Sequence, residues 1–275
     1  MNTSKPILRL SVCLIALICP VLSPGLFAAE GPLRPVGVAR MDITPTEPIR
    51  LTGYASRKTS SVGVEQRLWA KALALGSDAD GPAVLLTLDI CGLAEESYLD
   101  VVRRLAAKAR LPQERIALAC SHTHTGPCPS GWAPNIFVQD IPADQQAVID
   151  RYTQDLHGKL EQVALAALKD RQPARVSWAQ GQASFARNRR QPRPEGYVLA
   201  DNPTGPVDHA LPVLRVAAAD GKLRALVANY ACHCTTLGGE FNKVCGDWAG
   251  FAQEAIEQDH PDVIAFITIG CGADA

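Results

Sequence analysis

Short apolar runs alternate with stretches of helical periodicity, and this alternation constrains the fold more than any other feature of the chain. Apolar runs bounded by turn residues predict strands at 36–43, 69–75, 83–90, 115–120, 174–178, 211–217, 223–231 and 263–269. Apolar stripes at helical spacing predict helices at 95–110 and 143–168, and a last helix from Asp247 to 256. Strands that alternate with helices indicate α/β architecture, while the Asp220-Gly221 turn predicts a hairpin. The prediction is one large α/β domain with a mixed β-sheet core flanked by helices.

The charge balance excludes some classes of partner. The chain has 27 Lys and Arg against 28 Asp and Glu, for a formal net charge of −1. These charges are scattered along the sequence, whereas nucleic-acid binding needs a basic patch or stripe. We therefore expect no nucleic-acid partner.

The first 29 residues have the pattern of a secretory signal. Lys5 and Arg9 precede an apolar run that ends near residue 22, and the small residues Ala28 and Ala29 follow. The run is interrupted by Pro20 and is short for a helix of about 20 residues that spans a membrane. We predict a signal peptide at 1–29, an exported protein and a single domain at 30–275.

Seven of the nine cysteines lie beyond this leader, an odd number that leaves at least one thiol unpaired within the chain. Cys91, Cys120 and Cys271 each end or follow an apolar run, and we expect them to be small buried hydrophobes. Cys232 and Cys234 flank a histidine, but the second cysteine pair of a structural zinc site is missing. A cysteine–zinc knuckle is therefore disfavoured.

Two histidines directly follow the predicted strand that ends at Cys120. In the sequence Ser-His-Thr-His-Thr-Gly-Pro from residue 121, His122 and His124 are two residues apart. If extended geometry persists, both imidazoles face one side and Thr123 and Thr125 face the other. Neutral imidazoles are good zinc ligands. The alternative is a pair of hydrogen-bonded histidines without a metal.

Further polar residues close other predicted strands. His233 follows the strand at 223–231, and it is either a second metal ligand at the same sheet edge or a buried histidine bonded to backbone. Asp247 opens a helix, where a carboxylate can move a proton or can simply cap backbone amides. Asp89 ends the strand at 83–90 and could orient a ligand imidazole or cap a loop.

Two segments suggest how the site is framed. The Pro- and Gly-rich stretch 190–207 is predicted to be a long surface loop, a type of segment that is often functional. The loop at 270–275 follows the last strand directly, and we expect it to lack an element to pack against, as in a domain cut short.

Several motifs, in one order from about residue 35 onward, resemble the neutral/alkaline non-lysosomal ceramidase family. They are the segments 36–45, Gly53-Tyr54, 68–72, Asp89-Ile90-Cys91, His-Thr-His-Thr-Gly-Pro at 122–127, Asn188-Arg189, His233 and Gly246-Asp247. The histidine-rich motif is the most specific of these, with threonine at 125 where the family has serine.

This resemblance implies an α/β catalytic domain with one Zn²⁺ that hydrolyses the amide bond of ceramide to a sphingoid base and a fatty acid. It implies that His122 and His233 are zinc ligands, that His124 lies beside the metal, and that Arg189 lines the polar head of the substrate. The family completes its zinc site with a Glu and a Tyr from further along the chain, beyond residue 275. From the residues themselves, His124 and Asp247 are the groups that could move the proton of the attacking water.

Two other functions remain open. The family's serine in the loop after the last strand has no counterpart in Gly-Cys-Gly-Ala-Asp at 270–274, which leaves room for a zinc hydrolase acting on another amide or ester. A secreted binding module whose histidines only stabilise the fold is the non-enzymatic alternative. The expected partner is a small lipid or N-acyl substrate, with peripheral contact at a membrane surface.

Overall fold

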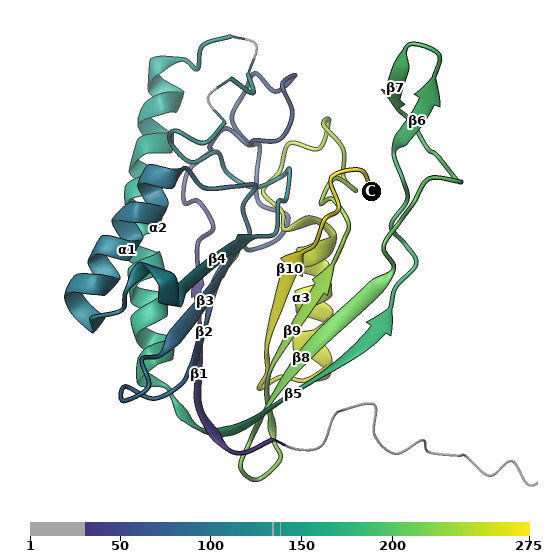
Figure 1. The fold of residues 1–275 in the computed structure, drawn as a ribbon. Helices are drawn as coiled ribbons and strands as arrows, with labels where there is room; N and C mark the ends of the chain where they lie inside the picture. Colours follow the sequence, from purple (N-terminus) through teal and green to yellow (C-terminus); the bar gives the residue numbers. More distant parts are fainter. Residues whose placement is uncertain (1–30, 134, 138) are drawn as a thin grey trace, which may run out of the picture.

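The computed structural model describes residues 31–133, 135–137 and 139–275, so the predicted signal peptide lies outside the described residues. An eight-stranded sheet in the order β10-β9-β8-β5-β1-β2-β3-β4 forms the centre of the structure (Figure 1). Its strands are β1 (Arg34–Asp42), β2 (Trp69–Leu75), β3 (Ala83–Leu88), β4 (Ile116–Cys120), β5 (Gln172–Gln182), β8 (Ala210–Ala218), β9 (Leu223–Tyr230) and β10 (Ile264–Ile269). The pairs β3–β4 and β9–β10 are parallel and the other neighbours are antiparallel, which confirms the predicted mixed sheet.

Two helices cover one face of the β1–β4 half of the sheet. They are α1 (Glu95–Ala109) and α2 (Ala143–Lys169), which pack on each other and, through α2, on β1, β2 and β3. α1 ends where Arg110 adopts a left-handed conformation and its N–H binds the carbonyls of Ala106 and Leu105, a common helix C-cap. α2 can approach β1 closely because Gly37 has no side chain, and a Cβ there would lie 2.0 Å from the Ala167 carbonyl oxygen.

The sheet curls so that its two ends approach each other. Side chains from β1, β2, β8, β9 and β10 form one buried cluster, and β10 contacts β1, β3 and β4. The third helix, α3 (Asp247–Asp259), packs beside β10. In Figure 1 the two halves of the sheet form a V, with loops from both halves gathered over its open end.

A buried polar clasp joins these two halves. Lys71 of β2 donates to the Glu257 carboxylate of α3 and to the Ala265 carbonyl of β10, both at 2.7 Å. The N–H of Ala265 donates in turn to Glu257 at 3.1 Å. The N–H and carbonyl of Ala265 in this edge strand are thereby satisfied. Burial lowers the pKa of Lys71, and the nearby carboxylates of Asp89 and Glu257 partly offset this shift.

The segment 190–207 is not simply a loop, and that prediction is wrong in part. It contains a two-stranded hairpin of β6 (Arg190–Arg193) and β7 (Gly196–Leu199). Its prolines and glycine suggested a loop, but Pro192 is accommodated in a short ribbon with free edges, where proline is tolerated. A short 3-10 turn, η1 (Gln113–Arg115), leads into β4.

The helices and strands otherwise follow the predictions closely, with shifts of a few residues at their ends. β5 is longer than the predicted 174–178 because its exposed second half pairs with β8 through to Gln182. Within the described part of the chain, no helix is both long enough and apolar enough to cross a membrane.

Candidate metal centre and substrate cavity

Three histidines from the two halves of the sheet converge at the open end of the V. His122 and His124 follow β4, and His233 follows β9. Their ring centroids lie 4.6 Å apart for His122–His233, 4.8 Å for His124–His233 and 5.0 Å for His122–His124. β4 and β9 are far apart in the strand order, so this convergence depends on the curling of the sheet.

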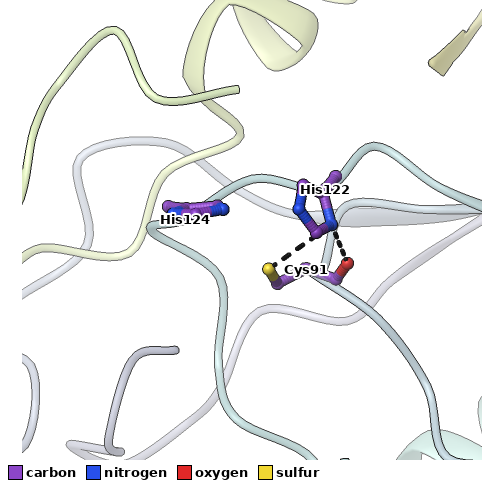
Figure 2. A group of neighbouring side chains, drawn as sticks. All are labelled: Cys91, His122 and His124. Carbon is purple, nitrogen blue, oxygen red and sulfur yellow. Dashed lines mark hydrogen bonds between the residues drawn. The ribbon is translucent and has the colours of Figure 1, made fainter. Parts of the chain in front are cut away.

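The backbone leaves the strand conformation before the histidines. His122 has φ 58°, in the left-handed region that few residues other than glycine adopt. The predicted persistence of extended geometry is therefore wrong, although both imidazoles still turn toward one site (Figure 2). Thr123 and Thr125 do face the opposite way, and both hydroxyls donate to the Cys245 carbonyl, at 2.9 and 2.7 Å.

Two of the three rings are oriented by backbone groups. Nδ1 of His122 lies 2.6 Å from the Cys91 carbonyl oxygen, which makes Nδ1 the donor and leaves the Nε2 lone pair free. The backbone of Gly272 hydrogen-bonds the His233 ring, an interaction that favours its protonated form. Such orienting bonds are typical of histidines that ligate metals. The Nδ1 atom of His124 is buried without a hydrogen-bond partner among the described residues, so this ring is held differently.

Electrostatics favour the neutral form of the His124 and His233 rings. Burial, followed by the proximity of His233 and His122, lowers the pKa of His124 to about 3. Burial and the neighbouring His122 likewise lower the pKa of His233 to about 4. Neutral imidazoles keep a lone pair for a metal, so the donor set fits Zn²⁺.

Cys91 offers an alternative ligand, since its Sγ and the rings of His122 and His124 present ligand atoms within 4.8 Å of one another (Figure 2). However, the His122 atom that faces this sulfur at 3.6 Å is Nδ1, the same atom that is bonded to the Cys91 carbonyl. Burial also raises the pKa of the Cys91 thiol far above its usual range. We therefore favour the imidazole set over a set that includes Cys91.

The two carboxylates singled out in the sequence bind backbone and amide groups. Asp247 is fully buried with φ 55°, and its oxygens accept from the N–H groups of Thr236, Leu237 and Trp248 at 3.3, 3.2 and 2.6 Å. It thereby ties the loop after His233 to the start of α3. Asp89 accepts from the Trp69 N–H and from Gln253, both at 2.9 Å, so its contacts correspond to a capping role and not to orienting an imidazole.

Arg189 lines a cavity of about 570 Å³ that opens beside His233. Its guanidinium reaches the Thr235 hydroxyl at 3.4 Å and the Ala273 carbonyl at 3.3 Å, while Nε has no hydrogen-bond partner in the described part of the chain. The wall combines apolar and polar side chains. It consists of Tyr54, Phe185, Arg187, Arg189, Leu199, Ala200, Asp201, Cys232, His233, Thr235, Thr236 and Ala275.

The loop at 270–275 is packed against this site, so the expectation that it lacks a packing partner is wrong. The Asp274 carbonyl accepts from the Arg189 N–H at 2.6 Å, and the Ala275 carbonyl accepts from the His233 N–H at 3.1 Å. Close approach requires glycine at 272, where a Cβ would lie 2.5 Å from the backbone nitrogen of Cys232.

Sequence reasoning missed the support beneath His124. Buried Arg57 donates to the carbonyls of Thr52, His124 and Phe241, and its guanidinium stacks on the Tyr54 ring with 4.9 Å to the centroid. Tyr54 in turn meets the His124 ring edge-on at 5.0 Å between centroids. Arg57 lies three residues after the Gly53-Tyr54 motif, and nothing in its local sequence distinguishes it from a surface arginine.

The cysteines follow their predictions in part. All seven described cysteines are free thiols, and Cys91 is buried as predicted. Cys120 is only partly buried, and Cys271 is exposed because it lies at the surface of the loop after β10. The prediction of burial is therefore wrong for Cys271.

The fold and the site define an α/β protein with a histidine cluster suited to a metal at one end of a curled mixed sheet. The profile of the neutral/alkaline non-lysosomal ceramidase N-terminal domain matches residues 35–266. The chain therefore belongs to the neutral/alkaline non-lysosomal ceramidase family, as its motifs predicted.

Individual relatives agree with this assignment. The chain is 26% identical over 264 residues to the neutral ceramidase of Pseudomonas aeruginosa, which covers 92% of this chain and 37% of the relative. Neutral ceramidase B of Dictyostelium discoideum is 23% identical over 228 residues, 79% of this chain and 30% of the relative. The chain thus spans about a third of the length of these curated relatives.

The solved structures support the fold. The crystal structure of neutral ceramidase from Pseudomonas aeruginosa superposes with a TM-score of 0.71 at 21% identity, covering 89% of this chain and 39% of that one. A structure described as ceramidase complexed with C2 superposes with a TM-score of 0.68 at 20% identity. The predicted α/β architecture is confirmed by this match.

Proposed function

We propose that this chain is part of a zinc-dependent amidohydrolase that cleaves the N-acyl amide bond of ceramide-like sphingolipids. The observation that carries the proposal is the convergence of His122, His124 and His233 beside an arginine-lined cavity in a member of this family. Substrate and cofactor are inferred from the relatives, which are named neutral ceramidases.

We assign His122 and His233 as the ligands because a backbone group orients each ring. A bound zinc would polarise the amide carbonyl and make a water molecule acidic enough to attack it. The remaining ligands would be a Glu and a Tyr beyond residue 275, as the family resemblance implies.

The other residues act on substrate and proton. His124 is favoured in its neutral form and lies directly beside His233, which supports a role in accepting the proton of the attacking water and passing it to the leaving amine. The Arg189 guanidinium can donate to a substrate hydroxyl or to the developing oxyanion. Phe185 and Leu199 give the cavity apolar surface for a hydrocarbon chain.

The test uses the protein purified from its native host. Zinc content and release of fatty acid from an N-acylsphingosine are measured together, the latter by mass spectrometry. We expect zinc at one equivalent per chain and hydrolysis that a chelator abolishes and added zinc restores. A zinc-loaded protein that cleaves no amide or ester would contradict the enzyme proposal and favour a binding module.

A second substrate class is kept because one sequence feature favours it. The loop at 270–274 lacks the serine expected from the family, and it lies against Arg189 and His233 at the cavity. An amide or ester other than ceramide is therefore the second candidate. A panel of N-acyl amino acids, N-acyl sugars and simple esters distinguishes the two by relative kcat/KM.

Export belongs to the same proposal, because the leader pattern predicts it and the described residues do not include the leader. Mass spectrometry of the mature protein should find an N-terminus near Glu30. An intact Met1 would contradict export through this leader.

A further inference from the structure

The β6–β7 hairpin projects away from the rest of the molecule (Figure 1). Its apolar side chains are exposed. Tyr197 is 74% exposed and Leu199 is 70% exposed, although both are of a size usually covered in a folded chain. Val198 between them is 42% exposed. Large apolar groups clustered at the end of a projecting element indicate an interaction surface.

The same segment is rich in arginine. Four arginines, Arg187, Arg189, Arg190 and Arg193, and two carboxylates, Glu195 and Asp201, lie between residues 187 and 201 and leave a net charge of +2. Arg187 and Asp201 pair at 3.2 Å, and both remain exposed. The rest of the chain has 23 Lys and Arg against 26 Asp and Glu, so the net positive charge is local to the hairpin and its flanks.

The hairpin is continuous with the cavity beside His233. Leu199 at the end of β7 and Arg187 and Arg189 before β6 all line that cavity. A surface contacted by the hairpin would therefore lie next to the cavity opening.

We propose that the β6–β7 hairpin docks the protein on anionic phospholipid membranes. Tyr197 and Leu199 insert among the headgroups, where amphipathic aromatic rings and aliphatic side chains are favourable. Arg190 and Arg193 attract the anionic surface. The purpose of docking rests on the proposed function, because docking would present membrane lipid directly to the cavity. Binding to the membrane itself does not depend on hydrolysis.

Charge complementarity favours a membrane over a second copy of the chain as the partner of the hairpin. A second copy of the chain would have to bring a matching acidic surface to this basic hairpin, whereas an anionic bilayer supplies negative charge and an apolar interior together. The test must therefore distinguish oligomerisation through the hairpin from membrane binding.

The experiment measures co-sedimentation of the protein with vesicles. One set contains phosphatidylcholine alone, and the other contains equal amounts of phosphatidylcholine and phosphatidylglycerol. We expect binding to the mixed vesicles that weakens with salt, and little binding to phosphatidylcholine alone. Tyr197→Ser should lower the partition coefficient about tenfold, the order expected for removing one inserted apolar side chain.

Matched variants separate the hairpin from general surface effects. Phe251→Ser removes an exposed aromatic ring from α3, and Lys243→Gln removes an exposed cation elsewhere, and neither should change vesicle binding. Arg193→Gln should reduce the preference for anionic vesicles. Equal binding by wild type and Tyr197→Ser, or no preference for phosphatidylglycerol, would overturn the proposal.

Size-exclusion chromatography with light scattering runs in parallel. If Tyr197→Ser converts an oligomer to a monomer without changing vesicle binding, the hairpin is an interface between copies and the membrane proposal is wrong. Vesicle binding by a protein that hydrolyses nothing would contradict the proposed function alone. Hydrolysis without vesicle binding would contradict docking alone.

Discussion

The Nε2 atoms of His124 and His233 lie 3.0 Å apart, although 109 residues separate the two histidines in the chain. One follows a strand at one end of the sheet and the other follows a strand near the opposite end. Their contact depends on the curling of the sheet, whose two halves share a buried apolar cluster and are bridged by Lys71 and Glu257. The histidine cluster is thus a product of the whole fold.

The three histidines should differ in their effect on zinc. We expect His122→Ala and His233→Ala to lose most bound zinc, because each substitution removes a ligand ring that a backbone group orients. His124→Ala should retain most of the zinc and lower kcat, because its ring has no such orienting bond. Zinc per chain is measured by mass spectrometry alongside kcat. Zinc loss in His124→Ala with retention in His122→Ala would reverse the assignment.

The clasp should be important for stability. Lys71→Met keeps the length of the side chain but leaves Glu257 and the Ala265 carbonyl without their buried donor. We expect the free energy of unfolding to fall by about 2–4 kcal/mol. This is somewhat less than the usual cost of breaking a buried ion pair, because Arg40 still pairs with Glu257. Urea denaturation measures the change.

Lys243→Met is the control for the clasp, since it breaks the exposed pair with Glu65. Its effect should stay below about 1 kcal/mol, as is usual for surface ion pairs. Equal effects of the two variants would show that the clasp is not what holds the halves together.

Asp247 should act through the loop that bears His233. Asp247→Ala removes the acceptor for three backbone N–H groups and places alanine at φ 55°, so the loop should move and zinc affinity should fall about 10- to 100-fold. Asp247→Asn, which keeps an acceptor and tolerates this conformation, should lose less. Calorimetric zinc titration separates the roles: unchanged affinity with lost kcat would favour a direct catalytic role.

Gly53 should be required for the position of His124. It has φ 94°, and a Cβ would lie 2.3 Å from Cγ of the His124 ring. Gly221 has φ 88° with open space around it, so Gly221→Ala measures the conformational strain alone, about 1–2 kcal/mol. Gly53→Ala should lower the stability further and also lower kcat. Similar stability losses with normal activity in both variants would argue against the steric effect.

Thiol reactivity should separate the cysteines by burial. Cys271 is exposed, whereas burial raises the pKa of Cys120 to about 12 and those of Cys128 and Cys245 to about 11. In the native protein, iodoacetamide should therefore label Cys271 first among these residues, as peptide mapping by mass spectrometry would show. Labelling of Cys120 at the same rate would contradict the described packing.

Much of the fold was predictable because its signals are local. Strands such as β2 and β3 are apolar runs bounded by turns, and α2 has an apolar stripe along its length. The β6–β7 hairpin was missed because its pairing depends on two short segments whose composition resembles a loop. The strand end at Cys120 was predicted, but the left-handed backbone of His122 directly after it was missed. This segment is held by contacts with distant residues, His122 with the Cys91 carbonyl and Thr123 with the Cys245 carbonyl, which the local sequence does not reveal.

By itself, the sequence determined the α/β class, the family, the two histidine-bearing motifs and the placement of each motif at a strand end. These follow from periodicity and residue type, which act over a few neighbouring positions. The sequence also predicted that the two motifs meet at one sheet edge. Only the tertiary structure decided how closely their rings approach, that Asp247 anchors a loop and that Arg57 supports His124. Those relationships join atoms from distant parts of the chain, and they arise from the curling and clasping of the sheet, which no local pattern encodes.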